Sequence, residues 1–191
     1  DMESVTLDKC VITGLPFIGE HSDLDVRSKM CIHVELHNKY RVLFAADSQN
    51  VEANVYKKVH AIMGDIDVLF LGMECDGAPL TWLYGPLLPK KMDRDKDQSR
   101  RLAGSNCNEG MDLVDQFNPK DVFVYAMGLE PWLEFISSIK YSDESKPIVE
   151  SNLLVEKCRE KGINAERLYG EKTIEYKEIY EDQNSLAGQY S

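Results

Sequence analysis

The sequence has little that would place it at a membrane, in a secretory pathway or on a nucleic acid. No stretch of its 191 residues approaches the roughly 18 uninterrupted apolar residues that span a bilayer, and residues 1–5 lack the basic start and apolar run of a signal peptide. Basic residues are also scarce, because 22 Lys and Arg face 33 Asp and Glu for a net charge of −11. Since such a chain repels phosphate backbones and anionic lipids, we expect a cytoplasmic protein with no nucleic-acid or membrane partner.

The cysteines and glycines do not form the motifs of several common protein classes. Five cysteines are scattered without a CxxC pair, which excludes a zinc ribbon and indicates free thiols in a reducing compartment. The chain also has no GxSxG, GxxxxGKS/T or GxGxxG motif. Serine-hydrolase, P-loop and Rossmann interpretations therefore lose their usual support.

What is present is enough for one folded domain. Apolar residues make up 43% of the chain, which suffices for a buried core, and the length favours a single domain. Residues 177–191 are polar and are expected to form a tail outside that domain.

Hydrophobic periodicity predicts an α/β fold. Antiparallel strands come first, at 5–13, 30–37 and 41–47, and the last two form a hairpin. Helices and strands alternate afterwards, as expected for a sheet covered by helices. The predicted helices are 51–62, 111–117, 131–139 and 149–161, and the predicted strands are 67–73, 121–127, 167–169 and 173–176.

Carboxylates follow three of the predicted strands. Asp47 ends VLFAAD, Glu74 and Asp76 follow VLFLGM, and Glu130 follows VFVYAMG. Because ligands of α/β sheets bind at the carboxyl ends of strands, these side chains are candidates for holding a hard cation or acting as a base. Any one of them alone is more often a cap or turn residue, and Asp47 with Ser48 is a fair helix N-cap, but several together favour a site.

Two polar clusters offer metal ligands of mixed type. The loop at 19–25 (GEHSDLD) includes Glu20 and His21, and mixed oxygen and nitrogen ligation suits zinc, iron or manganese. By itself this loop is more simply an exposed charged turn. His33, Glu35 and His37 alternate along one predicted strand and can chelate from one face, although such a face is more often solvated.

The order of several strings resembles the second half of a metallo-β-lactamase-fold protein. These strings are GEH, LFAAD, DVLFLGMECDG, MDLVDQFNPKDVFVYAMG and LVEKCREKGINAERLYGEKTIEY. The resemblance covers nearly the whole chain. It implies that residues 1–176 form the second half of an αββα sandwich, a mixed sheet with an antiparallel hairpin and covering helices.

Within that superfamily, PFIGEHSDLDVRSK and FLGMECDGAPLTWLYGPLL look most like the dinuclear-iron branch. That branch hydroxylates amino acids tethered to carrier proteins in nonribosomal peptide biosynthesis. The resemblance implies that Glu20 is an iron ligand, with His21 the alternative if the register shifts by one, and that Asp47 is the bridging carboxylate. A further ligand is expected from Glu74 or Asp76.

The chain departs from the superfamily in lacking the HxHxDH motif of the first half of the fold. Its histidines are His21, His33, His37 and His60, so this polypeptide alone offers only part of a dinuclear site. We expect either that the first half is a separate chain or a removed segment, or that the protein is a non-catalytic relic. A start at Asp1 rather than Met is consistent with a fragment.

Three functions follow from these observations. The first is an oxygenase with two iron ions that hydroxylates a carrier-protein-tethered amino acid or a related small substrate, with the aromatic loop 77–88 bordering the substrate channel. The second is a hydrolase of the same fold, in which zinc activates a water. The third is a metal-free binding module whose acidic surface meets a basic partner. The expected partners are a carrier protein, the first half of the fold, or a second copy of the chain.

Overall fold

The described strands form one mixed sheet whose spatial order follows the sequence. The computed structural model describes residues 2–18, 29–36, 40–50, 52–74, 89–90, 93, 104–132 and 141–175. Its strands are β1 (Ser4–Leu7), β2 (Cys10–Pro16), β3 (Met30–Leu36), β4 (Tyr40–Ala46), β5 (Val68–Gly72), β6 (Asp121–Tyr125) and β7 (Asn164–Arg167). Strands β1 to β4 pair antiparallel and β4 to β7 pair parallel, so the sheet changes character at β4.

The described helices connect the parallel strands, and each has a local reason to begin or end where it does. They are α1 (Ala53–Met63), α4 (Cys107–Phe117) and α6 (Lys146–Glu160). A capping box between Asn106 and Glu109 starts α4, and Asn118 ends it in the left-handed conformation with φ of 50°. Pro147 lies in the first turn of α6, where a missing backbone N–H costs nothing. None of the described helices is long and apolar enough to span a membrane.

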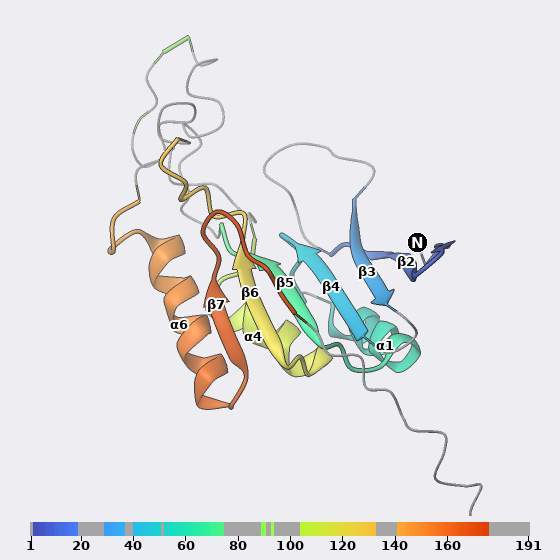
Figure 1. Cartoon of the computed structure of the whole chain (residues 1–191). Coiled ribbons are helices and arrows are strands. Elements are labelled where there is room, and N and C mark those ends of the chain that lie inside the picture. The colour runs from blue at the N-terminus through green and yellow to red at the C-terminus, as the bar shows by residue number, and fades with distance from the viewer. Residues whose placement is uncertain are drawn as a thin grey trace, which may run out of the picture.

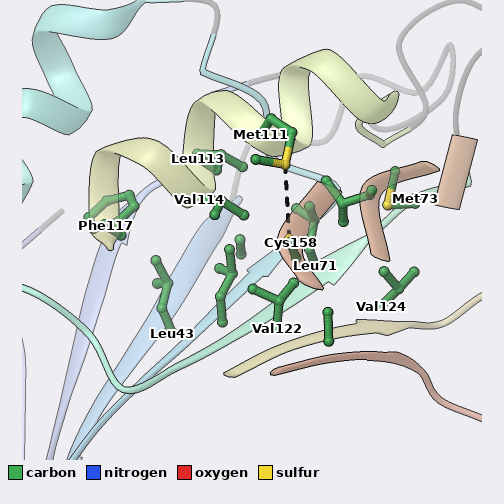
Figure 2. Packing of buried hydrophobic residues seen from close by; sticks show 14 of the residues in the cluster. Leu43, Leu71, Met73, Met111, Leu113, Val114, Phe117, Val122, Val124 and Cys158 are labelled. Carbon is green, nitrogen blue, oxygen red and sulfur yellow. Dashed lines mark hydrogen bonds between the residues drawn. The ribbon is translucent and has the colours of Figure 1, made fainter. Parts of the chain in front are cut away.

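All three helices cover the same face of the sheet. Right-handed crossovers that always advance toward the next strand place successive helices on one side, and Figure 1 shows them there. The core lies between the helices and this face, and Figure 2 shows its packing, with Leu71 and Val124 of the sheet below α4. Gly110 lets α4 approach closely, since a Cβ there would lie 2.8 Å from Leu154 and 3.0 Å from Leu71.

The opposite face of the sheet is apolar but has no helix over it in the described part of the chain. Phe44 stacks on Phe70 with ring centroids 4.7 Å apart, and Phe70 contacts Phe123 at 5.4 Å. The segment after β7 passes in front of β6 and β5 (Figure 1), and its Ile174 lines an open groove beside these rings. Ile32 of β3, on the same face, is 39% exposed.

The predicted mixed α/β sheet, with its antiparallel hairpin and covering helices, is confirmed. Two local predictions were wrong. The single strand expected at 5–13 is a hairpin of β1 and β2, because the polar Asp8 and Lys9 form a turn. Of the strand predicted at 173–176, residues 173–175 are described and form no strand. The helix predicted at 131–139 falls mostly on residues outside the described ranges.

Of the two described residues of the predicted chelate on β3, His33 and Glu35, the structure buries His33 deeply. Its side chain lies on the helix-covered face with 1% exposure, and neither ring nitrogen has a hydrogen-bond partner. Burial lowers the pKa of His33 below its ordinary value of 6.5, with opposing smaller effects of Glu35 and Arg41. The native state therefore holds a neutral histidine, which has a cost for stability in acid.

We predict that His33→Leu raises the free energy of unfolding by about 1 kcal/mol, because it removes buried nitrogens without partners. In the parent protein, the unfolded chain protonates at the ordinary pKa of 6.5 before the native chain does, so stability falls as the pH drops below that value. In His33→Leu, the free energy of unfolding should no longer fall over this pH range. Denaturant titrations between about pH 5 and 8 measure it. His60→Gln, at the Asp65 contact on α1, is the control that retains it. An unchanged decline in His33→Leu would contradict the prediction.

Candidate metal site

Three parallel strands bring predicted ligand positions to one edge of the sheet. Strands β4, β5 and β6 are parallel neighbours, so their carboxyl ends share that edge. Asp47 directly follows β4, Glu74 lies two residues after β5, and Glu130 follows the turn after β6. Backbone groups at such an edge have no further strand to pair with, which makes it the usual ligand-binding edge of an α/β sheet.

The backbone just before Asp47 is bent out of the regular strand. Ala46 has a φ of 50°, in the left-handed region that costs a non-glycine residue of the order of 1 kcal/mol. The pairing of β4 with β5 is also irregular between Phe44 and Ala46. This bend turns the residue after Ala46 toward the neighbouring strand β5.

The Asp47 carboxylate lies directly against the end of β5. A Cβ added to Gly72 would be 2.4 Å from Asp47 Oδ1 and 3.0 Å from the Ala46 carbonyl oxygen. Because side chains alternate along a strand, a Cβ at Gly72 would point to the same face as Phe70, the face without helices. The absent Cβ of Gly72 therefore forms the space that the carboxylate occupies.

Tyr125 borders this carboxylate from the next strand. It pairs with Gly72 in the register of β5 and β6, and its ring contacts Phe70 edge to face at 5.9 Å. Burial first, and then the nearby Asp47 charge, raise the pKa of the Tyr125 phenol above its usual value of 10.0. The phenol therefore keeps its proton beside a carboxylate.

The segment before α4 completes the described part of this edge. Ser105 N–H donates to the Gly72 carbonyl at 3.3 Å, and Gly104 packs against the backbone of Glu74. Gln49 Nε2 donates to the Gly104 carbonyl at 2.9 Å, which ties the residues after β4 to the same segment. The ends of β4 and β5 are thus joined through residues 104–105.

The predicted ligands fall into two groups. Asp47 and Glu74 are described and lie at the shared edge, both half-buried. Glu20, His21 and Asp76 lie outside the described residues. Ile18, two residues before Glu20, binds the backbone after Asp47 through the Gln49 N–H at 2.7 Å.

The described residues suit a hard cation but supply only part of its ligand set. Asp47 places a carboxylate in a space kept open by Gly72, and carboxylates are ligands for iron and other oxygen-preferring metals. No group of three His, Cys, Asp or Glu within the described ranges could hold a metal ion. The rest of a metal site therefore has to come from residues outside those ranges or from another polypeptide.

The alternative chelate on β3 does not form in the described residues. His33 is buried on the helix side, while the Glu35 carboxylate binds Arg41 Nε at 3.3 Å. His37 lies outside the described ranges. Sequence reasoning also missed Gly72 and Tyr125, although a glycine ending a buried strand is a known sign of close approach by another group.

Comparisons with known proteins identify one strong similarity. The chain is 43% identical over 174 residues to 4-amino-L-phenylalanyl-[CmlP-peptidyl-carrier-protein] 3-hydroxylase of Streptomyces venezuelae, covering 91% of this chain and 32% of that protein. The crystal structure of CmlA, a diiron β-hydroxylase from the same organism, matches with a TM-score of 0.73 and 44% identity over 88% of this chain and 32% of that one. The chain thus spans about a third of the length of these relatives.

Other comparisons add little. A putative zinc-dependent hydrolase of the metallo-β-lactamase superfamily from Thermotoga maritima has a TM-score of only 0.39 at 14% identity, over 71% of this chain and 50% of that one. We build no argument on that likeness. No protein-family model matches the chain.

We predict that Gly72→Ala lowers the free energy of unfolding by about 1–3 kcal/mol, because the new methyl group overlaps Asp47 Oδ1. In an Asp47→Ala background the penalty shrinks, leaving only the contact with the Ala46 carbonyl. A double-mutant cycle by denaturant unfolding measures this coupling. Gly14→Ala in β2 is the matched control, since its Cβ would meet only the flexible Met30 sulfur at 3.3 Å. Equal penalties in both backgrounds would exclude Asp47 as the cause.

Proposed function

We propose that this chain, a homologue of the diiron β-hydroxylase CmlA over about a third of that protein's length, is the carboxylate-bearing part of a metal-dependent hydroxylase. The observation that supports this most directly is the Asp47 carboxylate held at the ligand-binding edge of the sheet by the space over Gly72. The predicted relationship to diiron β-hydroxylases is confirmed by the homology, whereas the site and the reaction of this chain are proposals.

The proposed ligands come from three neighbouring segments of the chain. Asp47 would bridge two metal ions, Glu20 would bind from the loop after β2, and Glu74 or Asp76 would bind from the segment after β5. His21 is the alternative to Glu20. Two iron ions, when bound, would supply the activation of O₂ that hydroxylation of a C–H bond requires.

The chain's own residues would hold and insulate this site. The protonated Tyr125 phenol lies beside Asp47 and can donate a hydrogen bond at the site without adding charge. The stacked rings of Phe44, Phe70 and Phe123 give the sheet an apolar surface beside this site, which would exclude water once it is covered. We propose that the Asp47 carboxylate, which lies beside this apolar surface, binds metal there.

The proposed substrate is an amino acid tethered to a carrier protein. The relative acts on 4-amino-L-phenylalanyl bound to a peptidyl carrier protein. A tethered substrate would bring the carrier protein as a partner of this chain. Which amino acid side chain the site accepts depends on residues beyond the described edge.

The apolar sheet face indicates where a second half of the fold would pack. Phe44, Phe70 and Ile32 lie on the face that has no helix in the described part of the chain. We propose that residues 1–176 are the second half of the sandwich and that a polypeptide with the HxHxDH ligands packs on this face. It would complete the ligand set that the described residues lack.

Iron binding tests the proposed function. When the chain is combined with the proposed first half and loaded with ferrous iron without oxygen, we expect two iron ions per complex and, after oxidation, the absorption of a coupled ferric pair. Asp47→Asn removes a charged ligand and should lose one or both ions. Asp121→Asn is the control, because Asp121 is a carboxylate at the opposite edge of the same sheet, bound by Asn164.

The same measurement separates the alternatives. Zinc in place of iron, with unchanged stoichiometry, would favour the hydrolase of the same fold. Absence of any bound metal in the complex would overturn the proposal and favour a metal-free binding module that uses its acidic surface. Equal iron loss in Asp47→Asn and Asp121→Asn would remove Asp47 from the ligand set.

Association through the apolar face is a separate prediction. Ile32→Asp should weaken binding of the proposed first half at least about tenfold, because a charge would be buried in the interface, while the unfolding free energy of the chain alone stays within about 0.5 kcal/mol. Val149→Asp on α6 is the matched control, as Val149 is 40% exposed and Ile32 39%. Titration calorimetry measures the affinity. Equal weakening by both variants would contradict this docking surface.

A further inference from the structure

Tyr56 connects three segments through one buried hydroxyl. It lies on α1 with 2% exposure and packs edge to face on Phe117, with ring centroids 5.6 Å apart. Its hydroxyl donates to the Pro16 carbonyl at 3.0 Å and also contacts the Ser48 hydroxyl. Burial raises the pKa of this phenol far above its usual range, so the hydroxyl keeps its proton at neutral pH.

Ser48 makes the complementary contacts from the end of β4. Ser48 Oγ accepts from the Ile18 N–H at 3.2 Å and lies 3.1 Å from the Ile18 carbonyl, to which it donates. The neighbouring Gln49 N–H donates to the same carbonyl at 2.7 Å. Ser105 Oγ donates to the Ser48 carbonyl at 3.0 Å, which extends the network to the segment before α4.

The two hydroxyls contact each other, and each donates to a backbone carbonyl of the segment at 16–18. The Tyr56 and Ser48 hydroxyls supply two protons between them, which suffice for the Pro16 and Ile18 carbonyls, and each oxygen can still accept. Removing the Tyr56 hydroxyl takes a donor from the part-buried Pro16 carbonyl, and removing the Ser48 hydroxyl takes the acceptor from the Ile18 N–H. The pair therefore acts as a clamp between the strand end at 16–18 and the turn at 48–49.

The clamp lies one or two residues from two of the proposed ligands. Asp47 directly precedes Ser48, and Glu20 follows Ile18 by two residues, a span of at most about 7 Å. The clamp therefore fixes Ile18, the last described residue after β2, against the backbone next to Asp47. Neither Tyr56 nor Ser48 has a carboxylate or imidazole with which to bind the metal itself.

We propose that Tyr56 and Ser48 are positioning residues for the metal site, which hold residues 16–18 after β2 against the turn that carries Asp47. The inference rests on the proposed function, since it requires that these segments bind metal. It assigns the pair a role beyond stabilising the fold: metal affinity depends on the two hydroxyls more strongly than the stability of the protein does. Groups that orient the ligands of a metal site commonly change the metal affinity 10- to 100-fold when they are removed.

The test uses Tyr56→Phe, which keeps the ring packed on Phe117 and removes only the hydroxyl, and Ser48→Ala as an independent second variant. In the metal-free protein, we expect faster amide hydrogen exchange at Ile18 and Gln49, because their hydrogen bonds form part of the clamp. In the complex with the proposed first half, ferrous iron affinity should fall about tenfold or more, and the absorption of the oxidised pair should shift.

Val59→Ala is the control for stability alone. Val59 lies on the same helix with 3% exposure, and its truncation weakens packing without touching either hydroxyl. If Val59→Ala lowers iron affinity as much as Tyr56→Phe does, or if both clamp variants bind iron as the parent does, the positioning role is wrong. Faster exchange with unchanged iron affinity also overturns it.

The outcome also distinguishes this inference from the proposed function. If the parent binds two iron ions and Asp47→Asn does not, the proposed function holds whatever Tyr56→Phe does. If the parent complex binds no iron, both the proposed function and the positioning role are wrong. Should Tyr56→Phe fail to fold, Ser48→Ala decides between the remaining outcomes by the same two measurements.

Discussion

The parallel pairing of β4, β5 and β6 is the constraint on which the rest of the structure depends. Parallel strands need a crossover, and each crossover here contains a helix, so the chain returns every strand end to the same edge of the sheet. Asp47 and Glu74 are 27 positions apart in sequence yet follow adjacent strands. In the described part of the chain, one-sided crossovers also leave the other sheet face without a helix, and it is on this face that the Asp47 carboxylate lies.

Two local irregularities of the backbone, at Ala46 and Gly72, determine how Asp47 lies at this edge of the sheet. The positive φ of Ala46 and the missing side chain of Gly72 both carry a cost, since neither makes a regular strand more stable. Together they let a carboxylate lie across the end of β5. Tyr56 and Ser48 add a buried polar network behind this edge, where an apolar core would have been simpler. Such costs are typical of functional edges and unusual for a purely structural one.

The homology and the geometry both support the proposed metal site at this edge of the sheet. A relative with diiron chemistry shares 43% of its residues with this chain over the matched segment, and the described edge offers oxygen ligands without a complete set. The nitrogen ligands expected from an HxHxDH motif have no counterpart in the sequence. The proposed division of the site between this chain and another segment would account both for the incomplete ligand set and for the apolar sheet face.

The amino-acid sequence by itself determined the mixed α/β class, the β3–β4 hairpin, most of the strands and helices, and the carboxylates at strand ends, because hydrophobic period and strand-end position are local properties. The local pattern misled at two places: a turn at Asp8 and Lys9 divides residues 5–13 between two strands, and residues 173–175 form no strand. Only the tertiary structure decided that Asp47 lies over Gly72, that Tyr125 borders it, that His33 is buried without a partner, and that Tyr56 joins residue 16 to residue 48. These contacts join residues distant in sequence, and their formation depends on sheet register and helix packing, which no short stretch of the chain specifies.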